Sequence, residues 1–180
     1  MSTLRLNLPT ALTLSRIFLI PFFVLSVYQH ALLGALIFSI ASITDFLDGY
    51  LARRSGQITT FGIIMDPIAD KFLVISALVV LVDMERLSAL IAIILIVREF
   101  LVTTLRVVAL ARHIVIPAEL GGKLKTTAQI TGILCLILMS TVFDHFIFDL
   151  YDIGQVFIGL ALLLSVISAV QYTLAFWKRV

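Results

Sequence analysis

Six apolar runs dominate this chain of 180 residues. A helix that crosses a membrane needs about 20 mostly apolar residues. Apolar residues make up 61% of the chain and charged residues 13%, whereas a water-soluble domain is about half apolar and a quarter charged. We therefore expect an all-α integral membrane protein, a single domain over residues 1–180, with six transmembrane helices. The expected spans are Leu12–Tyr28, Ala31–Leu51, Ile63–Val82, Leu87–Leu110, Leu124–Phe143 and Ile153–Trp177.

Basic residues are distributed unevenly between the two sides of this six-span arrangement. Arg86 is the only base expected on one side, where several acidic residues gather. Cytoplasmic segments of membrane proteins carry the excess of Lys and Arg, so we expect a multi-pass protein of the inner (cytoplasmic) membrane with both termini in the cytoplasm. Such a basic face should also attract anionic lipid headgroups. The bases assigned to the cytoplasmic side are Arg5, Arg16, Arg53, Arg54, Arg106, Arg112, Lys123, Lys125, Lys178 and Arg179.

Four of the eleven acidic residues lie in one short window between residues 45 and 70. Asp45 and Asp48 end the second span, and Asp66 and Asp70 begin the third. Each pair is spaced three or four residues apart and shares a helix face, and a short connection brings the pairs together at the cytoplasmic edge. Clustered carboxylates at membrane depth need protons or multivalent cations. Oxygen-only ligands suit Mg²⁺, Mn²⁺ or Ca²⁺ and argue against zinc.

Other residues of this window have both functional and purely structural explanations. Asp66 precedes a proline and could simply cap a helix. Gly49, Ala52 and Gly62 leave room for a flat group to lie against the backbone, or they allow close helix packing. Arg53 could pair with a phosphate. On residue types alone, both explanations stay open.

The spacing of the whole window carries a more specific resemblance. The pattern Asp45-x2-Asp48-Gly49-x2-Ala52-Arg53-x8-Gly62-x3-Asp66-x3-Asp70 is similar to the signature of the CDP-alcohol phosphotransferases. These are six-span enzymes that move a phosphatidyl or similar group from a CDP-linked donor to an alcohol. The resemblance implies that family's fold, an active site at the cytoplasmic edge, two divalent cations (Mg²⁺ or Mn²⁺) as cofactors, and a homodimer.

The resemblance also implies a role for each position of the pattern. Asp45, Asp48 and Asp66 would bind the metals, and Asp70 would contact a metal and act as the catalytic general base. Two metals about 4 Å apart stabilise the attacking and leaving oxygens of a phosphoryl displacement together. The residues implied for binding of the CDP donor are Gly49, Ala52, Arg53 and Gly62.

Further bases gather near the same edge outside the acidic window. Arg98 and Arg106 are two turns apart on the fourth span, and Lys123 and Lys125 begin the fifth. Their position suggests a pocket for a second anion, such as an acceptor that carries its own phosphate. Within the span, Arg98 and Glu99 could instead form a structural ion pair.

Three stretches resemble the bacterial phosphatidylglycerophosphate synthases: NLPTALTLSR at 7–16, REFLVTTLRVVA at 98–109 and GGKLKTTAQ at 121–129. This likeness implies CDP-diacylglycerol as donor and sn-glycerol 3-phosphate as acceptor, with phosphatidylglycerophosphate and CMP as products. Inositol phosphate, phosphatidylglycerol or serine as acceptor stay open, as do, more remotely, an intramembrane prenyltransferase and a cation transporter. Nucleic acid is not an expected partner, because the bases line a membrane edge.

Overall fold

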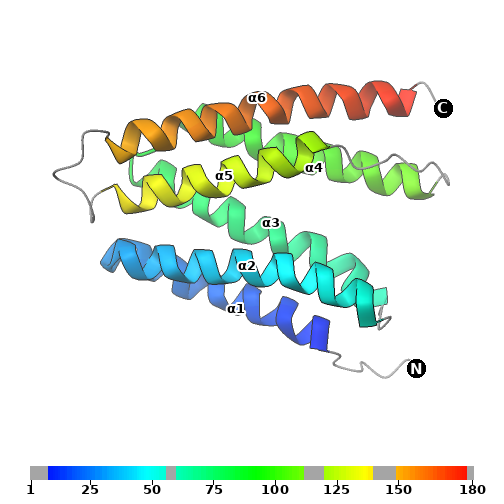
Figure 1. The fold of residues 1–180 in the computed structure, drawn as a ribbon, viewed down its shortest axis with the longest axis horizontal. Helices are drawn as coiled ribbons and strands as arrows, with labels where there is room; N and C mark the ends of the chain where they lie inside the picture. Colours follow the sequence, from blue (N-terminus) through cyan, green and yellow to red (C-terminus); the bar gives the residue numbers. More distant parts are fainter. Residues whose placement is uncertain (1–7, 56–59, 112–119, 140–148, 178–180) are drawn as a thin grey trace.

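The structure is a computed structural model, and it describes residues 8–55, 60–111, 120–139 and 149–177 (Figure 1). Every regular element in these ranges is an α-helix, as the sequence predicts. Each helix overlaps one of the expected spans. The helices are α1 (Leu8–Gln29), α2 (Ala31–Ser55), α3 (Thr60–Asp83), α4 (Ala89–Ala111), α5 (Leu120–Leu138) and α6 (Leu150–Trp177).

Several helices extend beyond the apolar runs that predict them. α2 continues to Ser55, α3 already begins at Thr60, and α5 begins at Leu120. Backbone hydrogen bonding holds a helix together in polar as well as in apolar sequence, so hydropathy fixes the span and not the helix end. Because α3 begins well before Asp66, that residue lies inside the helix, and the explanation of Asp66 as a helix cap is wrong.

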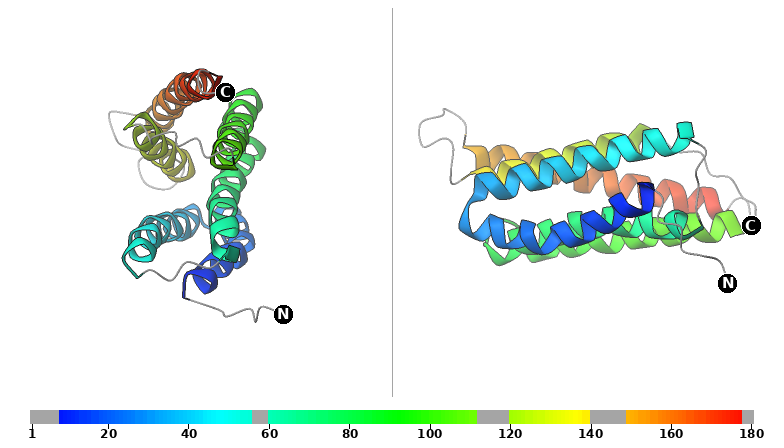
Figure 2. Two further views of the ribbon diagram at one scale, coloured as in Figure 1. Left: turned by 90° about the vertical axis from the view of Figure 1, so that its right-hand side faces the viewer. Right: turned by 90° about the horizontal axis from the view of Figure 1, so that it is seen from below.

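The six helices run alternately up and down (Figure 1). Contacts follow the order α1–α3–α4–α6–α5–α2 and return to α1, so the helices form a closed ring that the end-on view in Figure 2 shows. α2 and α4 end at one end of the bundle, where α3 and α5 begin (Figure 1). We call this the site end, because the helical segments that carry the four aspartates lie there.

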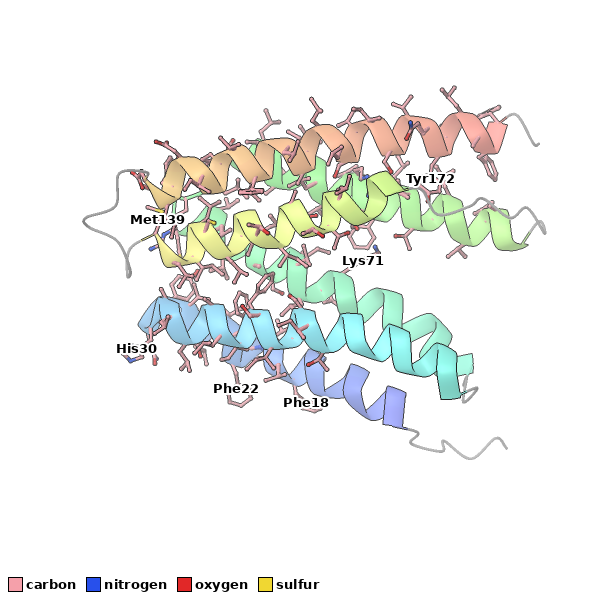
Figure 3. The ribbon with its side chains drawn as sticks, in the orientation of Figure 1. Phe18, Phe22, His30, Lys71, Met139 and Tyr172 are labelled. Atoms are coloured by element: carbon pink, nitrogen blue, oxygen red, sulfur yellow. The ribbon has the colours of Figure 1, made fainter. Side chains whose placement is uncertain are left out.

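Apolar side chains fill the space between the helices and also cover the outside of the bundle. Phe23 of α1 and Phe38 of α2 are fully buried, with ring centroids 5.6 Å apart. Phe18 and Phe22 point outward from α1 (Figure 3) and are 72% and 63% exposed, and exposed Leu, Ile and Val side chains occur on the other helices. Soluble proteins rarely expose apolar surface on this scale, so the outer surface fits lipid.

Within the described part of the chain, one helix is by itself long and apolar enough to cross a membrane, and it is α6. Shorter apolar helical stretches occupy Phe18–Gln29, Ala31–Thr44 and Leu124–Leu138.

The opposite end of the bundle is held by Arg86. α3 ends at a turn in which Glu85 adopts the left-handed conformation, with φ of 59°. The next residue, Arg86, donates hydrogen bonds of 2.9 Å to the carbonyls of Leu136 and Ile137, near the end of α5. The Gln155 amide donates to the Arg86 carbonyl at 2.8 Å. Arg86, the one Arg or Lys that the sequence predicts for this side, therefore binds helix-end carbonyls that lack a partner within the helix.

Candidate active site

The four aspartates of the sequence pattern occupy two neighbouring helix segments at the site end. Asp45 and Asp48 lie in the last part of α2, and Asp66 and Asp70 lie in the first part of α3. The side chains of residues 45–70 lie outside the described part of the structure, so the roles expected for the aspartates, and for Gly49, Ala52, Arg53 and Gly62, stay predictions. Among the described residues, no group of three or more His, Cys, Asp or Glu could hold a metal.

The donor set fits the metals that the sequence predicts. Four aspartates on adjacent helix segments offer carboxylate oxygens only, which are the ligands preferred by Mg²⁺ and Mn²⁺. The two aspartates of each pair are about one helical turn apart and so share a helix face. Backbone geometry therefore allows the two faces to be directed toward the same space between α2 and α3. The residues present are therefore compatible with two divalent cations.

A cavity of about 150 Å³ lies between α2, α3, α4 and α5, inside the ring of helices. Ser42 lines it from α2 and precedes Asp45 by three residues, and Val74 lines it from α3 and follows Asp70 by four. Asp45 and Asp70 are therefore each about one helical turn from a residue that lines the cavity. The polar residues of the wall are Ser42, Lys71, Glu99, Lys125, Thr126 and Gln129.

Glu99 is the centre of an ion-pair cluster at this cavity. Its carboxylate accepts hydrogen bonds from Lys71 of α3 at 3.3 Å and from Arg98 at 3.0 Å. Lys125 of α5 donates a further hydrogen bond to it. Figure 3 shows Lys71 reaching from α3 into the space beside α5. Three cations thus surround one carboxylate, which leaves an excess of positive charge beside the cavity.

Arg98, expected to bind an acceptor phosphate, is firmly held by α6. Its Nε donates to the Ser165 carbonyl at 2.9 Å, and its Nη2 donates to Ser168 Oγ at 2.8 Å. The side chain is only 9% exposed. The ion pair with Glu99 that the sequence left open is present, so Arg98 connects α4 with α6 and orients Glu99.

Of the remaining bases of the expected phosphate pocket, the structure describes the side chain of Lys125 and only the helix positions of Arg106 and Lys123. Lys125 is 3% exposed and lines the cavity. Arg106 lies further along α4 toward the site end, and Lys123 lies in the first turn of α5, but their side chains are outside the described part. The structure therefore brings Arg98 and Lys125 together through Glu99.

Comparison with known proteins agrees with the position and chemistry of this site. Residues 6–170 match the family described as CDP-alcohol phosphatidyltransferase, a range that includes the aspartate pattern and the basic segments. The chain belongs to the CDP-alcohol phosphatidyltransferase family. This is a family of membrane proteins, in agreement with the apolar outer surface of the helix ring.

Several bacterial relatives match the chain over nearly its whole length. A protein of Bacillus subtilis is 37% identical, with 96% of each chain covered. A protein of Rickettsia bellii is 36% identical over 92% of this chain and 93% of its own. A protein of Yersinia enterocolitica is 38% identical, with 97% of each covered. All three are named CDP-diacylglycerol–glycerol-3-phosphate 3-phosphatidyltransferase.

Lys71, Glu99 and Gln129 are among the cavity residues of this CDP-alcohol phosphatidyltransferase that were not predicted as site residues. Lys71 directly follows Asp70, and Glu99 directly follows Arg98, so their place beside expected site residues was a usable signal. Gln129 follows Lys125 by four residues and therefore shares its helix face. The sequence shows these neighbour relations, but it does not show that α3, α4 and α5 converge on one cavity.

Proposed function

We propose that this chain transfers the phosphatidyl group of CDP-diacylglycerol to sn-glycerol 3-phosphate, forming phosphatidylglycerophosphate and CMP. The observation that carries the proposal is the agreement among near-full-length relatives that share this enzyme name. The basic cluster beside the cavity adds support from this chain, because an acceptor with its own phosphate needs cations that a neutral acceptor does not need.

On the donor side, the residues of α2 and α3 bind and orient the CDP-linked lipid. Asp45, Asp48, Asp66 and Asp70 would hold two divalent cations, Mg²⁺ or Mn²⁺. When bound, these ions supply a clamp for the diphosphate and offset the charge that develops during displacement. The small residues at positions 49, 52 and 62 admit the cytidine, and Arg53 faces the donor phosphates.

On the acceptor side, the phosphate of glycerol 3-phosphate binds to the bases of α4 and α5. Lys125 lines the cavity, Arg106 and Lys123 extend the basic set, and Arg98 adds its charge from beside the cavity through Glu99. Asp70 takes the proton of the primary hydroxyl, whose oxygen forms a bond to the β-phosphorus of the donor. The bond from that phosphorus to the CMP oxygen breaks, and CMP leaves.

The membrane arrangement follows from the same assignment. All six helices span the inner membrane with the site end at the cytoplasmic edge and both termini in the cytoplasm, in accord with the excess of bases near that end. The donor then enters from the cytoplasmic leaflet with its acyl chains among the helices. The likeness to the family's signature supports a homodimer.

The test is CMP release by detergent-purified protein with CDP-diacylglycerol and Mg²⁺. Glycerol 3-phosphate, inositol 1-phosphate, serine and phosphatidylglycerol are compared as acceptors. Turnover with glycerol 3-phosphate alone is the expected result. Turnover with another acceptor only would retain the donor chemistry and overturn the assigned acceptor, whereas no turnover with any of them would overturn the assigned donor.

A further inference from the structure

Gln129 is a buried polar residue whose side chain has no partner in the described part of the structure. It is 5% exposed and lines the cavity together with Lys125, one helical turn away on α5. No hydrogen bond joins its amide to a described residue, and its amide is not among the fully enclosed unpaired groups of the described residues, so it is open to the cavity that it lines. Buried amides are almost always hydrogen-bonded, because leaving one unpaired is costly. The amide of Gln129 is therefore available to a molecule in the cavity.

The cavity is suited to a small molecule with polar groups. Its volume of about 150 Å³ is well above the roughly 10–15 Å³ that such a cavity needs to hold one water. Leu73, Leu78, Leu95 and Ile130 are among the apolar residues that line it. A ligand with a short carbon chain and several polar groups would match both kinds of surface.

The polar groups of glycerol 3-phosphate can be assigned to the cavity one by one. The phosphate is assigned to Lys125. The reacting primary hydroxyl is assigned to the side of Asp70, which precedes the cavity residue Val74 by about one helical turn. The secondary hydroxyl is then the one polar group left to be bound. A hydroxyl both donates and accepts hydrogen bonds, and so does a glutamine amide.

We propose that Gln129 hydrogen-bonds the secondary hydroxyl of the acceptor and makes the site selective for a polyol phosphate. This inference rests on the proposed function. Gln129 is then a specificity-determining residue, since it contacts the acceptor away from the reacting oxygen. A site built to bind a hydroxyl discriminates against an analogue that lacks it, because its own polar group is left unpaired.

The experiment compares two acceptors that differ only in this hydroxyl, glycerol 3-phosphate and 3-hydroxypropyl phosphate. The proteins are the wild type, Gln129→Leu and Gln129→Met, with Gln171→Leu as the matched control because Gln171 is exposed on α6. The readout is kcat/KM for each acceptor at saturating CDP-diacylglycerol. We expect the wild type to prefer glycerol 3-phosphate by about tenfold, the worth of about one hydrogen bond.

Both Gln129 variants should lose this preference, through a lower kcat/KM for glycerol 3-phosphate and an unchanged value for 3-hydroxypropyl phosphate. The control should keep the wild-type ratio. A wild type that shows no preference for glycerol 3-phosphate over 3-hydroxypropyl phosphate would overturn the inference, and this result does not depend on whether the variants fold. Gln129 variants whose kcat/KM falls by the same factor for both acceptors would also overturn it. Failure of the proposed function gives a different result, because the wild type then releases no CMP with glycerol 3-phosphate. In that case the inference about Gln129 fails as well.

Discussion

The ammonium group of Lys71 lies 3.3 Å from the Oε1 atom of Glu99. Lys71 directly follows Asp70, the expected general base, whereas Glu99 also pairs with Lys125, the base that lines the cavity from α5. One carboxylate thus connects the helix of the expected base with the helix of the expected phosphate ligand. Movement of either helix would disturb the other's contribution to the site.

Replacement of Glu99 by Gln should weaken acceptor binding. The change removes the charge that compensates Lys71 and Lys125, and a buried cation without its ion-pair partner is destabilised in its place. Displacement of either ammonium removes a cation from the acceptor site. We expect the KM for glycerol 3-phosphate to rise by about tenfold or more, with the KM for CDP-diacylglycerol nearly unchanged, as steady-state kinetics can measure.

The matched control for this change is Glu85→Gln, because Glu85 is exposed in the turn at the opposite end of the bundle. It should leave both KM values as in the wild type. Glu99→Asp should recover part of the acceptor affinity, since it keeps the charge. An unchanged acceptor KM in Glu99→Gln, together with a lower kcat, would mean that Glu99 supports the fold and does not position the cations.

Arg98→Lys should destabilise the bundle although it preserves the charge. The guanidinium binds Ser165, Ser168 and Glu99 from three different nitrogens, and an ammonium cannot reproduce that arrangement. We expect a loss of about 2 kcal/mol or more, seen as a lower midpoint of thermal unfolding in detergent. Ser168→Ala removes only one of these bonds and should cost about 1 kcal/mol. A wild-type midpoint for Arg98→Lys would contradict a structural role.

Two glycines provide a matched test of helix packing. A Cβ at Gly34 of α2 would lie 2.4 Å from Val27 Cγ2 and 2.9 Å from the Val27 Cα, whereas a Cβ at Gly159 of α6 would meet nothing within 4 Å. Gly34→Ala should therefore force α1 and α2 apart and cost about 1–3 kcal/mol. Gly159→Ala should be neutral or stabilise by up to about 1 kcal/mol. Equal unfolding midpoints for the two variants would contradict the observed packing of α1 on α2.

Much of the fold could be predicted because hydropathy determines where a helix can cross a membrane. The expected turn between the first two spans agrees with α1 ending at Gln29 and α2 beginning at Ala31. The helix ends at the site end could not be predicted, since α2, α3 and α5 continue into polar sequence. The order of the helices in the ring could not be predicted either, because it depends on packing between helices and not on the sequence of any single apolar run.

The connections within the candidate site could not be predicted from the sequence. Arg98 and Lys125 were expected as independent phosphate ligands, yet in the structure they share Glu99. The partners of Arg98 on α6 lie about 70 residues away in the chain, and no local pattern indicates them. Long-range contacts of this kind depend on which helices become neighbours, and spacing along one helix carries no information on that.

Asp70→Asn gives the most direct test of the expected chemistry at the site end. The change keeps the size of the side chain and removes the base that would take the proton of the acceptor hydroxyl. We expect kcat to fall by about 10²–10⁴-fold, while CDP-diacylglycerol binding in the presence of Mg²⁺ is largely retained. CMP release and donor binding, measured on the same preparation, separate these two effects.

Two controls make the result specific to the proposed site. Asp152→Asn changes an exposed carboxylate in the first turn of α6, at the opposite end, and should leave turnover unchanged. Treatment of the wild type with EDTA should abolish CMP release, and added Mg²⁺ or Mn²⁺ should restore it, because oxygen ligands accept both ions. If Asp70→Asn kept near-normal turnover while EDTA still abolished it, the metals would remain assigned and the proton would have to pass to a group other than Asp70.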